Sequence, residues 1–366
     1  MTLRDALPVR TDAMLDDLRT LVETESPSRD PEALATSARA VAALVESRLG
    51  GRATVIANEG GSHVHWSGGG DPKVLLLGHH DTVFPLGTLA RRPFAVRDGR
   101  ATGPGVFDML GGLVQGVHGL AALDDLSGVE LLVTADEEVG SRSSRALLEE
   151  RALACGAVLV LEGAADGGGL KTARKGCGTF TVTITGRAAH AGLEPETGVN
   201  ALVEAAHQVL AIAAFGRPEA GTTVVPSVAA AGTASNVVPA QATVAVDVRV
   251  ETAEEKERVE AAFAGLTPYL EGALVEVRGA VDRPPMPESA ATGLFALART
   301  LLPGVEGRAV GGGSDGNFTA ALGVPTLDGL GAVGGGAHAD HEYLLVDAMA
   351  ERADLVTGLV RAIRNG

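Results

Sequence analysis

Carboxylate and imidazole side chains recur in this chain directly after strand-like runs of apolar residues. The first case is Gly78-His79-His80-Asp81-Thr82, which follows the run Val74–Leu77. A buried strand that ends on such groups delivers them to the carboxyl edge of a sheet, where open α/β folds place their sites. Carboxylate oxygens and imidazole nitrogens without a thiolate suit zinc, manganese or cobalt in a hydrolytic site. Groups of this kind that follow later runs are Asp108, Glu137, Glu138, Glu162 and His338.

These residues divide naturally between two ions. His79, Asp108 and Glu162 could hold one ion, and Asp108, Glu138 and His338 could hold the other, with Asp108 as the bridge. Three protein ligands for each ion leave a position open for water. The adjacent Glu137 and Glu138 cannot both face one ion from a regular strand, because successive side chains point to opposite sides. At a strand end, where the chain turns, one can bind metal while its neighbour reaches the water.

The elements that must position these groups alternate between strand-like and helical patterns. This alternation is typical of a mainly parallel sheet covered by helices on both faces, which makes the fold class α/β. We expect strands at 74–77, 129–134 and 157–161, and a further strand that ends near Leu327. We expect helices at 13–23, 31–49, 109–123, 143–151 and 347–363.

A different pattern begins at Gly178. The runs 179–185 and 243–250 alternate strictly between apolar and polar residues and enclose a helix near 200–214. Strict alternation marks a sheet with one solvated face, which favours an antiparallel arrangement. We therefore predict an inserted α+β domain at 178–282, with the first domain made of residues 1–177 and 283–366. The proline-rich segment from Arg283 to Pro287 is the expected return linker.

Composition restricts the partners and the compartment. The formal net charge of −16, with no basic patch, argues against nucleic acid or an anionic membrane surface as a partner. The first twenty residues carry four aspartates and have no continuous apolar core, so we expect neither a signal peptide nor a membrane span, and a cytoplasmic protein. Cys155 and Cys177 lack a CxxC spacing and are expected to stay reduced.

Five ordered motifs resemble those of the M20 metallopeptidases. They are Gly78-His79-His80-Asp81-Thr82-Val83, Gly103-Pro104-Gly105-Val106-Phe107-Asp108-Met109, Ala135-Asp136-Glu137-Glu138-Val139-Gly140, Leu161-Glu162-Gly163 and Ala337-His338. Within that family the chain is most similar to the glutamate carboxypeptidase group, which is related to acetylornithine and succinyl-diaminopimelate deacylases. The likeness covers nearly the whole chain, including the segment Gly186–Gly192 of the inserted domain.

This resemblance implies a zinc-peptidase-like fold with a ferredoxin-like lid or dimerisation domain. It also implies two zinc ions per subunit, with Co²⁺ or Mn²⁺ as possible substitutes. Glu137 would be the general base, and Asp81 would accept from the free ring N–H of His79. The bond Asp108–Met109 matches a position that is cis in the family. The implied metal ligands are His79, Asp108, Glu138, Glu162 and His338.

Two other histidines are alternatives to these ligands. His80 lies between a ligand and Asp81, and strand alternation points it away from the metal. His341 follows His338 by three residues and could take its place as a ligand. We favour His338, because it follows the flexible segment Gly334–Ala337, as the family pattern requires.

The inserted domain offers a second set of polar residues. In the run 243–250 the valines face one way, which leaves Asp247 and Arg249 on the other face. The segments Ala234–Pro239 and Asp247–Arg249 resemble the family region whose Asn and Arg hold the terminal carboxylate of the substrate. The planar fork of arginine suits a carboxylate. The predicted substrate-binding residues are Asn236, Arg249 and Arg283.

Two further features concern anions and the oxyanion of the reaction. His190 is implied to stabilise the oxyanion, in several relatives from the partner subunit, so we expect a homodimer through the inserted domain. The segment Gly311–Asp315 precedes a helix and could receive an anion, although a plain helix cap by Ser314 or Asp315 is an equal alternative.

The expected function is hydrolysis of an amide bond next to a free carboxylate, with release of a C-terminal glutamate-like amino acid from a small peptide or N-acyl amino acid. The alternative within the family is an N-acyl-amino-acid deacylase. A non-catalytic binding protein on the same fold is a third alternative. Glu137 argues against it, because a binding module has no need of a general base.

Overall fold

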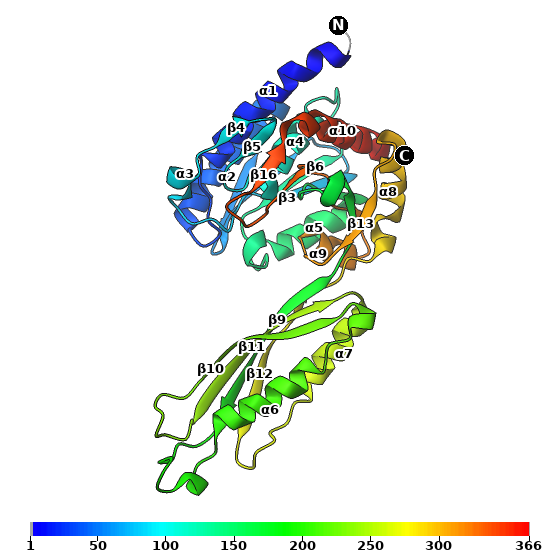
Figure 1. The fold of residues 1–366 in the computed structure, drawn as a ribbon. Coiled ribbons are helices and arrows are strands. Elements are labelled where there is room, and N and C mark those ends of the chain that lie inside the picture. Colours follow the sequence, from blue (N-terminus) through cyan, green and yellow to red (C-terminus); the bar gives the residue numbers. More distant parts are fainter. Residues whose placement is uncertain (1–2, 366) are drawn as a thin grey trace. The chain divides into compact units, whose positions relative to one another are not determined.

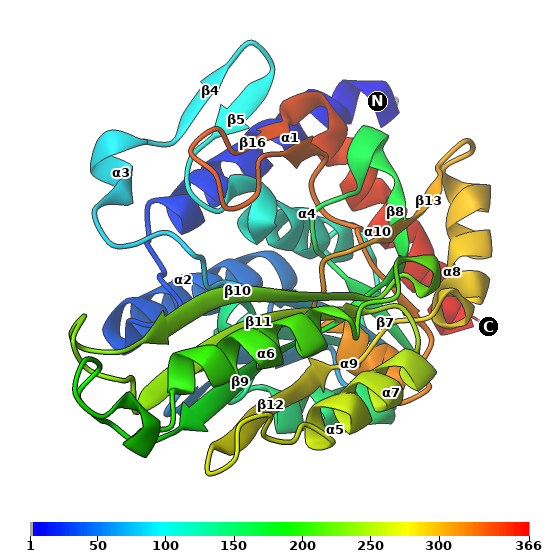
Figure 2. The same ribbon diagram turned by 60° about the horizontal axis from the view of Figure 1, so that its bottom comes forward.

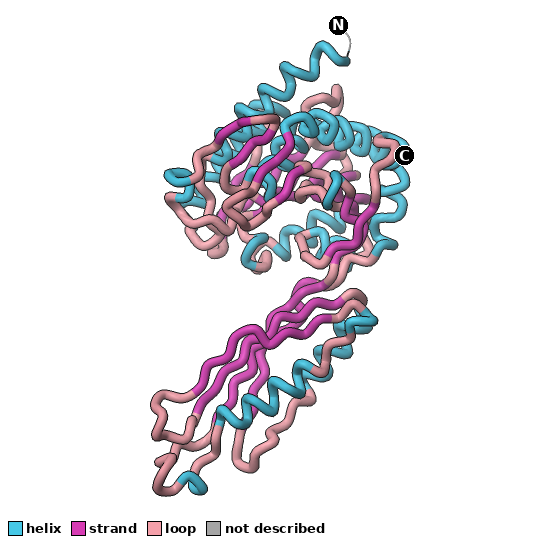
Figure 3. Tube along the Cα trace, viewed as in Figure 1, coloured by secondary structure: helices cyan, strands magenta, loops and turns pink. Residues whose placement is uncertain are grey.

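The computed structural model describes residues 3–365, with side chains from Arg10 onward. These residues form two compact units, both of which contain helices and strands (Figure 3). The main unit comprises the described residues up to Ala173, Met286–Val310 and those from Ser314 onward. The inserted unit comprises Arg174–Pro285 and Gly311–Gly313.

A six-stranded sheet forms the centre of the main unit (Figure 1). Its strand order is β1-β2-β6-β3-β7-β14, and β6, β3, β7 and β14 run parallel to one another. The edge pair β1 and β2 is antiparallel. The structure therefore confirms a mainly parallel sheet. The strands are β1 (Thr54–Asn58), β2 (Gly61–Ser67), β3 (Val74–His79), β6 (Val129–Thr134), β7 (Ala157–Val160) and β14 (Thr326–Leu327).

Helices cover both faces of this sheet, because its central strands are apolar on both sides. Every residue of β3 is buried. Leu76 packs on the face that carries α1, α2, α4, α8 and α10, whereas Leu75 and Leu77 pack on the face that carries α5 and α9. The helices are α1 (Leu3–Val22), α2 (Pro31–Leu49), α4 (Gly111–Leu120), α5 (Arg145–Ala154), α8 (Glu288–Leu301), α9 (Gly316–Ala321) and α10 (Met349–Asn365).

Smaller elements support the loops at the edge of the main sheet. A second sheet has the order β15-β16-β5-β4, and a two-stranded sheet joins β13 to β8. In the second sheet Tyr343 pairs with Thr102, which brings the C-terminal loops beside the segment that precedes Asp108. The elements are α3 (Thr88–Arg91), β4 (Ala95–Arg97), β5 (Arg100–Thr102), β8 (Leu170–Arg174), β13 (Gly307–Val310), β15 (Gly334–Gly335) and β16 (Tyr343–Leu345).

The inserted unit is an antiparallel sheet with two helices on one face (Figure 2). Its strand order β10-β11-β9-β12, with one helix after β9 and one after β11, is the ferredoxin-like arrangement that was expected. The elements are β9 (Gly176–Thr185), α6 (Ala201–Ala213), β10 (Thr223–Ala231), β11 (Gln241–Val250), α7 (Ala253–Ala264) and β12 (Leu274–Arg283).

Alternation in β11 explains how this sheet buries one face. The valines at 244, 246, 248 and 250 are fully buried and pack in one core with Ile212 of α6 and Phe263 of α7. Asp247 and Arg249 point to the opposite face and remain partly exposed. The expected orientation of these two polar residues is therefore confirmed.

Candidate metal centre

Parallel strands of the main unit gather the candidate ligands at one edge of the sheet. His79 ends β3, Glu137 and Glu138 lie in the turn of helix η2 (Glu137–Val139) after β6, and Glu162 follows β7. Asp108 lies in the short helical segment η1 (Val106–Leu110), and its peptide bond to Met109 is cis, as expected. Because β3, β6 and β7 are parallel neighbours, their carboxyl ends meet.

The side chains of these residues face one another. His79 Nε2 lies 3.5 Å from Asp108 Oδ1 and 3.5 Å from Glu162 Oε1. His338 Nε2 lies 3.2 Å from Asp108 Oδ2 and 3.0 Å from Glu138 Oε1. The two oxygens of Asp108 thus face the two different histidines, as a bridging carboxylate requires. We call His79, Asp108, Glu138, Glu162 and His338 the ligand cluster.

The donor set fits divalent cations. His79 Nε2 is buried and has no hydrogen-bond partner, although it faces carboxylate oxygens. Two groups of three side chains each have ligand atoms within 4.8 Å of one another, and a group this tight can surround one ion. These groups are His79, Asp108 and Glu138, and His79, Glu137 and Glu162.

Several carboxylates surround the imidazoles of His79 and His338 and change the pKa values of both rings. Burial lowers the pKa of His79, but the carboxylates of Asp108, Asp81 and Glu162 outweigh it and raise that pKa well above its usual value. Asp108 and Glu138 raise the pKa of His338 to about 10. In the protein without metal, protons on the imidazoles balance the carboxylates, and a cation would replace those protons.

Asp81 contacts the Nδ1 atom of His79 through its carboxylate, as expected, and also through its backbone carbonyl. The Nδ1 atom of His79 lies 2.9 Å from the backbone carbonyl oxygen of Asp81 and 3.4 Å from its carboxylate. The carboxylate also accepts hydrogen bonds from the backbone N–H groups of Glu137 and Glu138, each at 3.2 Å. The turn after β6 approaches closely enough to supply these donors. Asp81 therefore holds both the imidazole ring and the turn that carries Glu137.

The two alternative histidines lie outside the ligand cluster. His80 is fully buried, and its ring nitrogens contact the Ser37 hydroxyl at 3.0 Å and the Ser62 carbonyl oxygen at 2.9 Å. Burial lowers its pKa to about 4, so His80 is a neutral core residue. His341 and His338 are both exposed, and it is His338 whose Nε2 lies beside the carboxylates of Asp108 and Glu138.

Sequence reasoning missed the buried acid Glu342 and considered Asp315, a second buried acid, only as a helix cap. Glu342, which is fully buried, accepts from the backbone N–H groups of Gly105, Phe107 and Asp108. Burial raises its pKa to about 7. The only signal in the sequence was an acid close to His338. Asp315 accepts from Thr134 Oγ1 at 2.9 Å and also from the Ser141 hydroxyl.

Ser314 acts at the start of α9, where its Oγ accepts from the backbone N–H of Gly316 at 3.1 Å. The same hydroxyl donates to Asp328 Oδ2 at 2.6 Å. Asp315 occupies the cap position of α9 without a side-chain capping bond, so Ser314 anchors the turn before the helix.

In the inserted unit, His190 and Asn236 lie together. His190 forms an isolated bridge with Val237, and the Asn236 carbonyl oxygen accepts from Ala191 N at 2.9 Å. The Nδ1 atom of His190 accepts hydrogen bonds from the backbone N–H groups of Gly192 and Leu193, at 3.1 and 3.2 Å. A ring nitrogen that accepts carries no proton, so the proton of the neutral ring lies on Nε2, ready to be donated.

Arg249 and Arg283 lie at the opposite end of the same sheet. Both pair in register with Cys177 at the start of β9, whereas Thr185, at the other end of β9, leads toward His190. Eight residue steps separate Cys177 from Thr185, which is about 27 Å at a rise of about 3.4 Å per residue. The structure therefore brings the four predicted residues together as two separate pairs.

Arg249 keeps part of its hydrogen-bonding capacity. Its Nε and Nη2 atoms donate to the two carboxylate oxygens of Asp247, both at 3.0 Å, and this pairing raises the pKa of the guanidinium. A guanidinium has five N–H groups, so the edge formed by Nη1 and Nη2 can still receive another carboxylate. About a third of the side chain (35%) is exposed to solvent.

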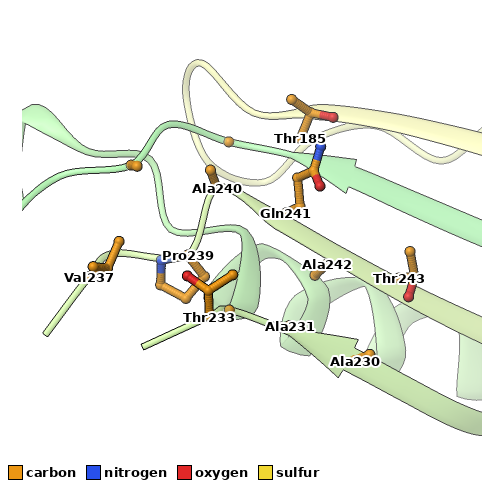
Figure 4. Close-up of a pocket in the computed structure, with 13 residues that line it drawn as sticks. Thr185, Ala230, Ala231, Thr233, Val237, Pro239, Ala240, Gln241, Ala242 and Thr243 are labelled. Atoms are coloured by element: carbon orange, nitrogen blue, oxygen red, sulfur yellow. The ribbon is translucent and has the colours of Figure 1, made fainter. Parts of the chain in front are cut away.

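A cavity of about 440 Å³ lies beside the ends of β9, β10 and β11 (Figure 4). Small and neutral side chains line it, among them Thr185, Thr233, Val237 and Gln241. No lining residue is ionisable, so the cavity offers neither a general base nor a metal ligand.

Comparison with known proteins identifies the class of protein. Residues 75–362 match the model of peptidase family M20/M25/M40. The chain is 32% identical over 376 residues to carboxypeptidase G2 of Pseudomonas sp. (strain RS-16), covering 97% of this chain and 90% of that protein. The chain therefore belongs to peptidase family M20/M25/M40 and is a hydrolase of the metallopeptidase type, which confirms the resemblance of its motifs.

Other relatives and structures agree with this assignment. One component of p-aminobenzoyl-glutamate hydrolase from Escherichia coli (strain K12) is 35% identical over 133 residues, which are 34% of this chain and 30% of that protein. The aminopeptidase PepT structure from Bacillus cereus ATCC 10987 has a TM-score of 0.76 at 22% identity and covers 97% of this chain and 99% of its own. A dinuclear metal-binding peptidase of the M20 family from Bacillus subtilis has a TM-score of 0.66 at 15% identity. The match covers 98% of this chain and 99% of that protein.

Among the described residues, each helix is too short or too polar to cross a lipid bilayer.

Proposed function

We propose that this chain is a two-metal amidohydrolase that releases an amino acid with a free carboxylate, with a preference for a glutamate-like one. The observation that carries the proposal is the ligand cluster, in which the two oxygens of Asp108 face His79 and His338 on different sides. Glu137, the sequence neighbour of the proposed ligand Glu138, has a carboxylate oxygen within 4.8 Å of ligand atoms of His79 and Glu162, and this proximity supports its role as the base.

His79, Asp108 and Glu162 would hold one ion, and Asp108, Glu138 and His338 the other. The oxygen and nitrogen donors favour zinc, with cobalt or manganese as substitutes. When bound, the ions supply Lewis-acid polarisation of the amide carbonyl and favour ionisation of water. Glu137 takes the proton from the attacking water and delivers it to the leaving amine nitrogen. Asp81 keeps Glu137 in place through the backbone of its turn.

The preference for an acidic amino acid rests on two supports. One relative is named as a hydrolase of p-aminobenzoyl-glutamate, an amide of glutamate. In this chain, Arg249 presents a guanidinium edge that suits a carboxylate, and Arg283 pairs with the same position of β9. We propose that Arg249 binds the carboxylate of the released amino acid and that Arg283 assists it.

The length of β9 supports a dimeric active site. One substrate cannot contact both ends of a sheet that are about 27 Å apart. Arg249 and Arg283 lie at the end where the inserted unit joins its own main unit through the chain. We propose that this pair serves its own subunit, while His190 and Asn236 serve the partner subunit of a homodimer. His190 Nε2–H then donates to the oxyanion that forms at the carbonyl.

An N-acyl-amino-acid deacylase is the second candidate. It uses the same centre and differs only in which side of the amide is large. A non-catalytic binding protein is disfavoured because a binding protein needs neither Glu137 nor a bridging Asp108.

A hydrolysis screen tests the proposal. The protein is loaded with zinc, and release of free amine is measured with p-aminobenzoyl-glutamate and with N-acetyl and N-benzoyl derivatives of Glu, Asp, Gln, Ala, Leu and Arg. Faster hydrolysis of the glutamate and aspartate derivatives supports the carboxypeptidase function. Rates of hydrolysis that depend on the acyl group rather than on the amino acid support the deacylase. If a protein that holds zinc releases amine from none of these amides, both candidate functions are refuted.

A further inference from the structure

Glu342 connects two of the proposed ligands through backbone contacts. It lies four residues after His338, and the turn between them is closed by hydrogen bonds from Ala339 N to Gly336 O at 3.0 Å and from Glu342 N to Ala339 O at 3.1 Å. We call the segment Gly105–Asp108 the Asp108 loop. The Glu342 side chain reaches across to this loop, which is more than 230 residues away in the chain.

The carboxylate of Glu342 gathers three backbone donors of the Asp108 loop. Oε2 accepts from Gly105 N at 2.8 Å, and Oε1 accepts from Phe107 N and Asp108 N, both at 2.9 Å. The side chain has no contact with solvent. Burying a carboxylate is costly unless hydrogen bonds compensate, and here all three donors belong to the loop that carries the bridging ligand.

We propose that Glu342 is a positioning residue for the metal centre, which fixes the Asp108 loop against the His338 turn so that both can bind the same ion. This inference rests on the proposed two-metal function. A bridging carboxylate must direct its two oxygens at two ions, and the backbone N–H of Asp108 itself is one of the groups that Glu342 holds. Without that contact the loop can rotate, and the distance between Asp108 Oδ2 and His338 Nε2 is no longer fixed at 3.2 Å.

A glutamine cannot replace this carboxylate. Its amide offers one acceptor oxygen and two N–H donors, so at least one backbone donor of the Asp108 loop would face another donor. The matched control is Glu204 of the inserted unit. It is also fully buried and accepts from the backbone N–H groups of Tyr269 and Leu270, but it holds no proposed ligand.

The experiment compares Zn²⁺ and Co²⁺ affinity in the wild type, E342Q, E342D and E204Q by competition with a chromophoric chelator. We expect E342Q to bind about 10- to 100-fold more weakly, as is typical when groups behind metal ligands are removed. E342D should lie between E342Q and the wild type, and the visible spectrum of the Co²⁺ form of E342Q should change. E204Q should lower the unfolding temperature without a change in affinity or spectrum.

Wild-type affinity and an unchanged Co²⁺ spectrum in E342Q would overturn the inference while the proposed function stands. A wild type that binds neither ion would overturn the proposed function and the inference together. A measurement on the wild type without metal covers the case in which E342Q does not fold. The amide hydrogens of Gly105, Phe107 and Asp108 should exchange slowly, and exchange at the rate of an open loop would refute the contacts.

Discussion

The ligand cluster and the inserted unit differ in how far a single chain brings its candidate residues together. In the main unit, residues from separate stretches of sequence have ligand atoms within 4.8 Å of one another. In the inserted unit, His190 and Asn236 lie at one end of the sheet, and Arg249 and Arg283 at the other. The first region gathers its candidate residues in one cluster, and the second holds its candidate residues as two separate pairs.

Strand direction explains the difference. Parallel strands have all their carboxyl ends at one edge, so the loops after β3, β6 and β7 converge. Antiparallel strands place successive connections at opposite ends, and a ten-residue strand keeps those ends far apart. In the proposed homodimer, two copies of the antiparallel unit would serve one substrate, whereas the parallel sheet gathers its candidate ligands within one chain.

The largest expected effect tests the completeness of the main unit. Glu137→Gln removes the proposed base without removing a ligand of the cluster, so turnover should fall about 10²- to 10⁴-fold while two ions stay bound. Asp108→Asn is the matched contrast, because a neutral amide bridges two cations poorly and occupancy should fall at both positions. Metal analysis beside the amide assay checks both variants, and empty sites in Glu137→Gln would refute the role of Glu137.

The next prediction tests whether the inserted unit works as two half-sites. His190→Ala should lower kcat on the order of 10²- to 10³-fold, as the loss of an oxyanion donor does. When Glu137→Gln and His190→Ala subunits are mixed, hybrid dimers contain one intact site, and about a quarter of wild-type activity should return if each dimer is symmetric and exchange is random.

A second mixture controls that experiment. Arg249→Ala replaces His190→Ala as the partner of Glu137→Gln. If Arg249 serves its own subunit, each site of this hybrid carries one defect and activity should not return. Recovery in both mixtures would place Arg249 across the interface. Recovery in neither, after proven subunit exchange, would place His190 in its own subunit or outside catalysis.

Much of the main unit could be read from the sequence, because buried parallel strands are continuous apolar runs. The predicted strand 129–134 and helix 31–49 agree with β6 and α2 residue by residue. The hairpin of β1 and β2 was missed, because its residues, such as His63 and His65, mix polar with apolar character. The strand propensity of such a mixed segment is weak, and β2 forms a strand because it pairs with β6.

The same contrast applies to the site. His79, Glu138 and Glu162 stand at the ends of parallel strands, which apolar runs reveal. Asp108, which was expected directly after a strand-like run, lies in the helical segment η1. Glu342 gave no such signal, because its role depends on backbone donors of a loop that is distant in sequence. Asn236 and Arg249 were assigned to one carboxylate, although the antiparallel pattern around them already implied opposite ends of a long strand. Strand length in the expected sheet would have predicted that separation.

A smaller effect tests whether substrate binding needs the planar guanidinium of Arg249 or only its positive charge. Arg249→Lys keeps the charge but loses both the paired contact with Asp247 and the free edge, so kcat/KM should fall on the order of 10²-fold through misplacement of the substrate. Zinc content and unfolding temperature should not change. Arg278→Lys, at an exposed position of β12 on the other side of β9, is the control and should behave as wild type. Equal kinetics for the two variants would remove Arg249 from substrate binding.

The smallest expected effect concerns stability of the inserted unit in acid, where Glu255 ties α7 to the segment before β10. It accepts from Thr222 Oγ1 at 2.6 Å and from Arg258 Nη2 at 2.6 Å, and Arg258 above all lowers its pKa to about 2. A folded-state pKa below the unfolded value stabilises the fold at pH values above the unfolded pKa, and that stability is lost as pH falls toward the folded pKa. The contribution should therefore be complete above about pH 4.5 and disappear toward about pH 2, with a size of about 1 kcal/mol for a partly solvated ion pair.

Calorimetric unfolding of the wild type and Glu255→Gln between pH 3 and 7 measures this contribution. The wild type should unfold at a higher temperature than Glu255→Gln at pH 7. The difference between the two unfolding temperatures should become smaller as the pH approaches 3. Glu257→Gln is the control, because Glu257 is exposed on the same helix and has no ion pair within the described part of the chain. A gap that stays constant with pH would mean that Glu255 stabilises α7 by packing alone. Metal binding should not differ among the three proteins, because the ligand cluster draws every one of its residues from the main unit.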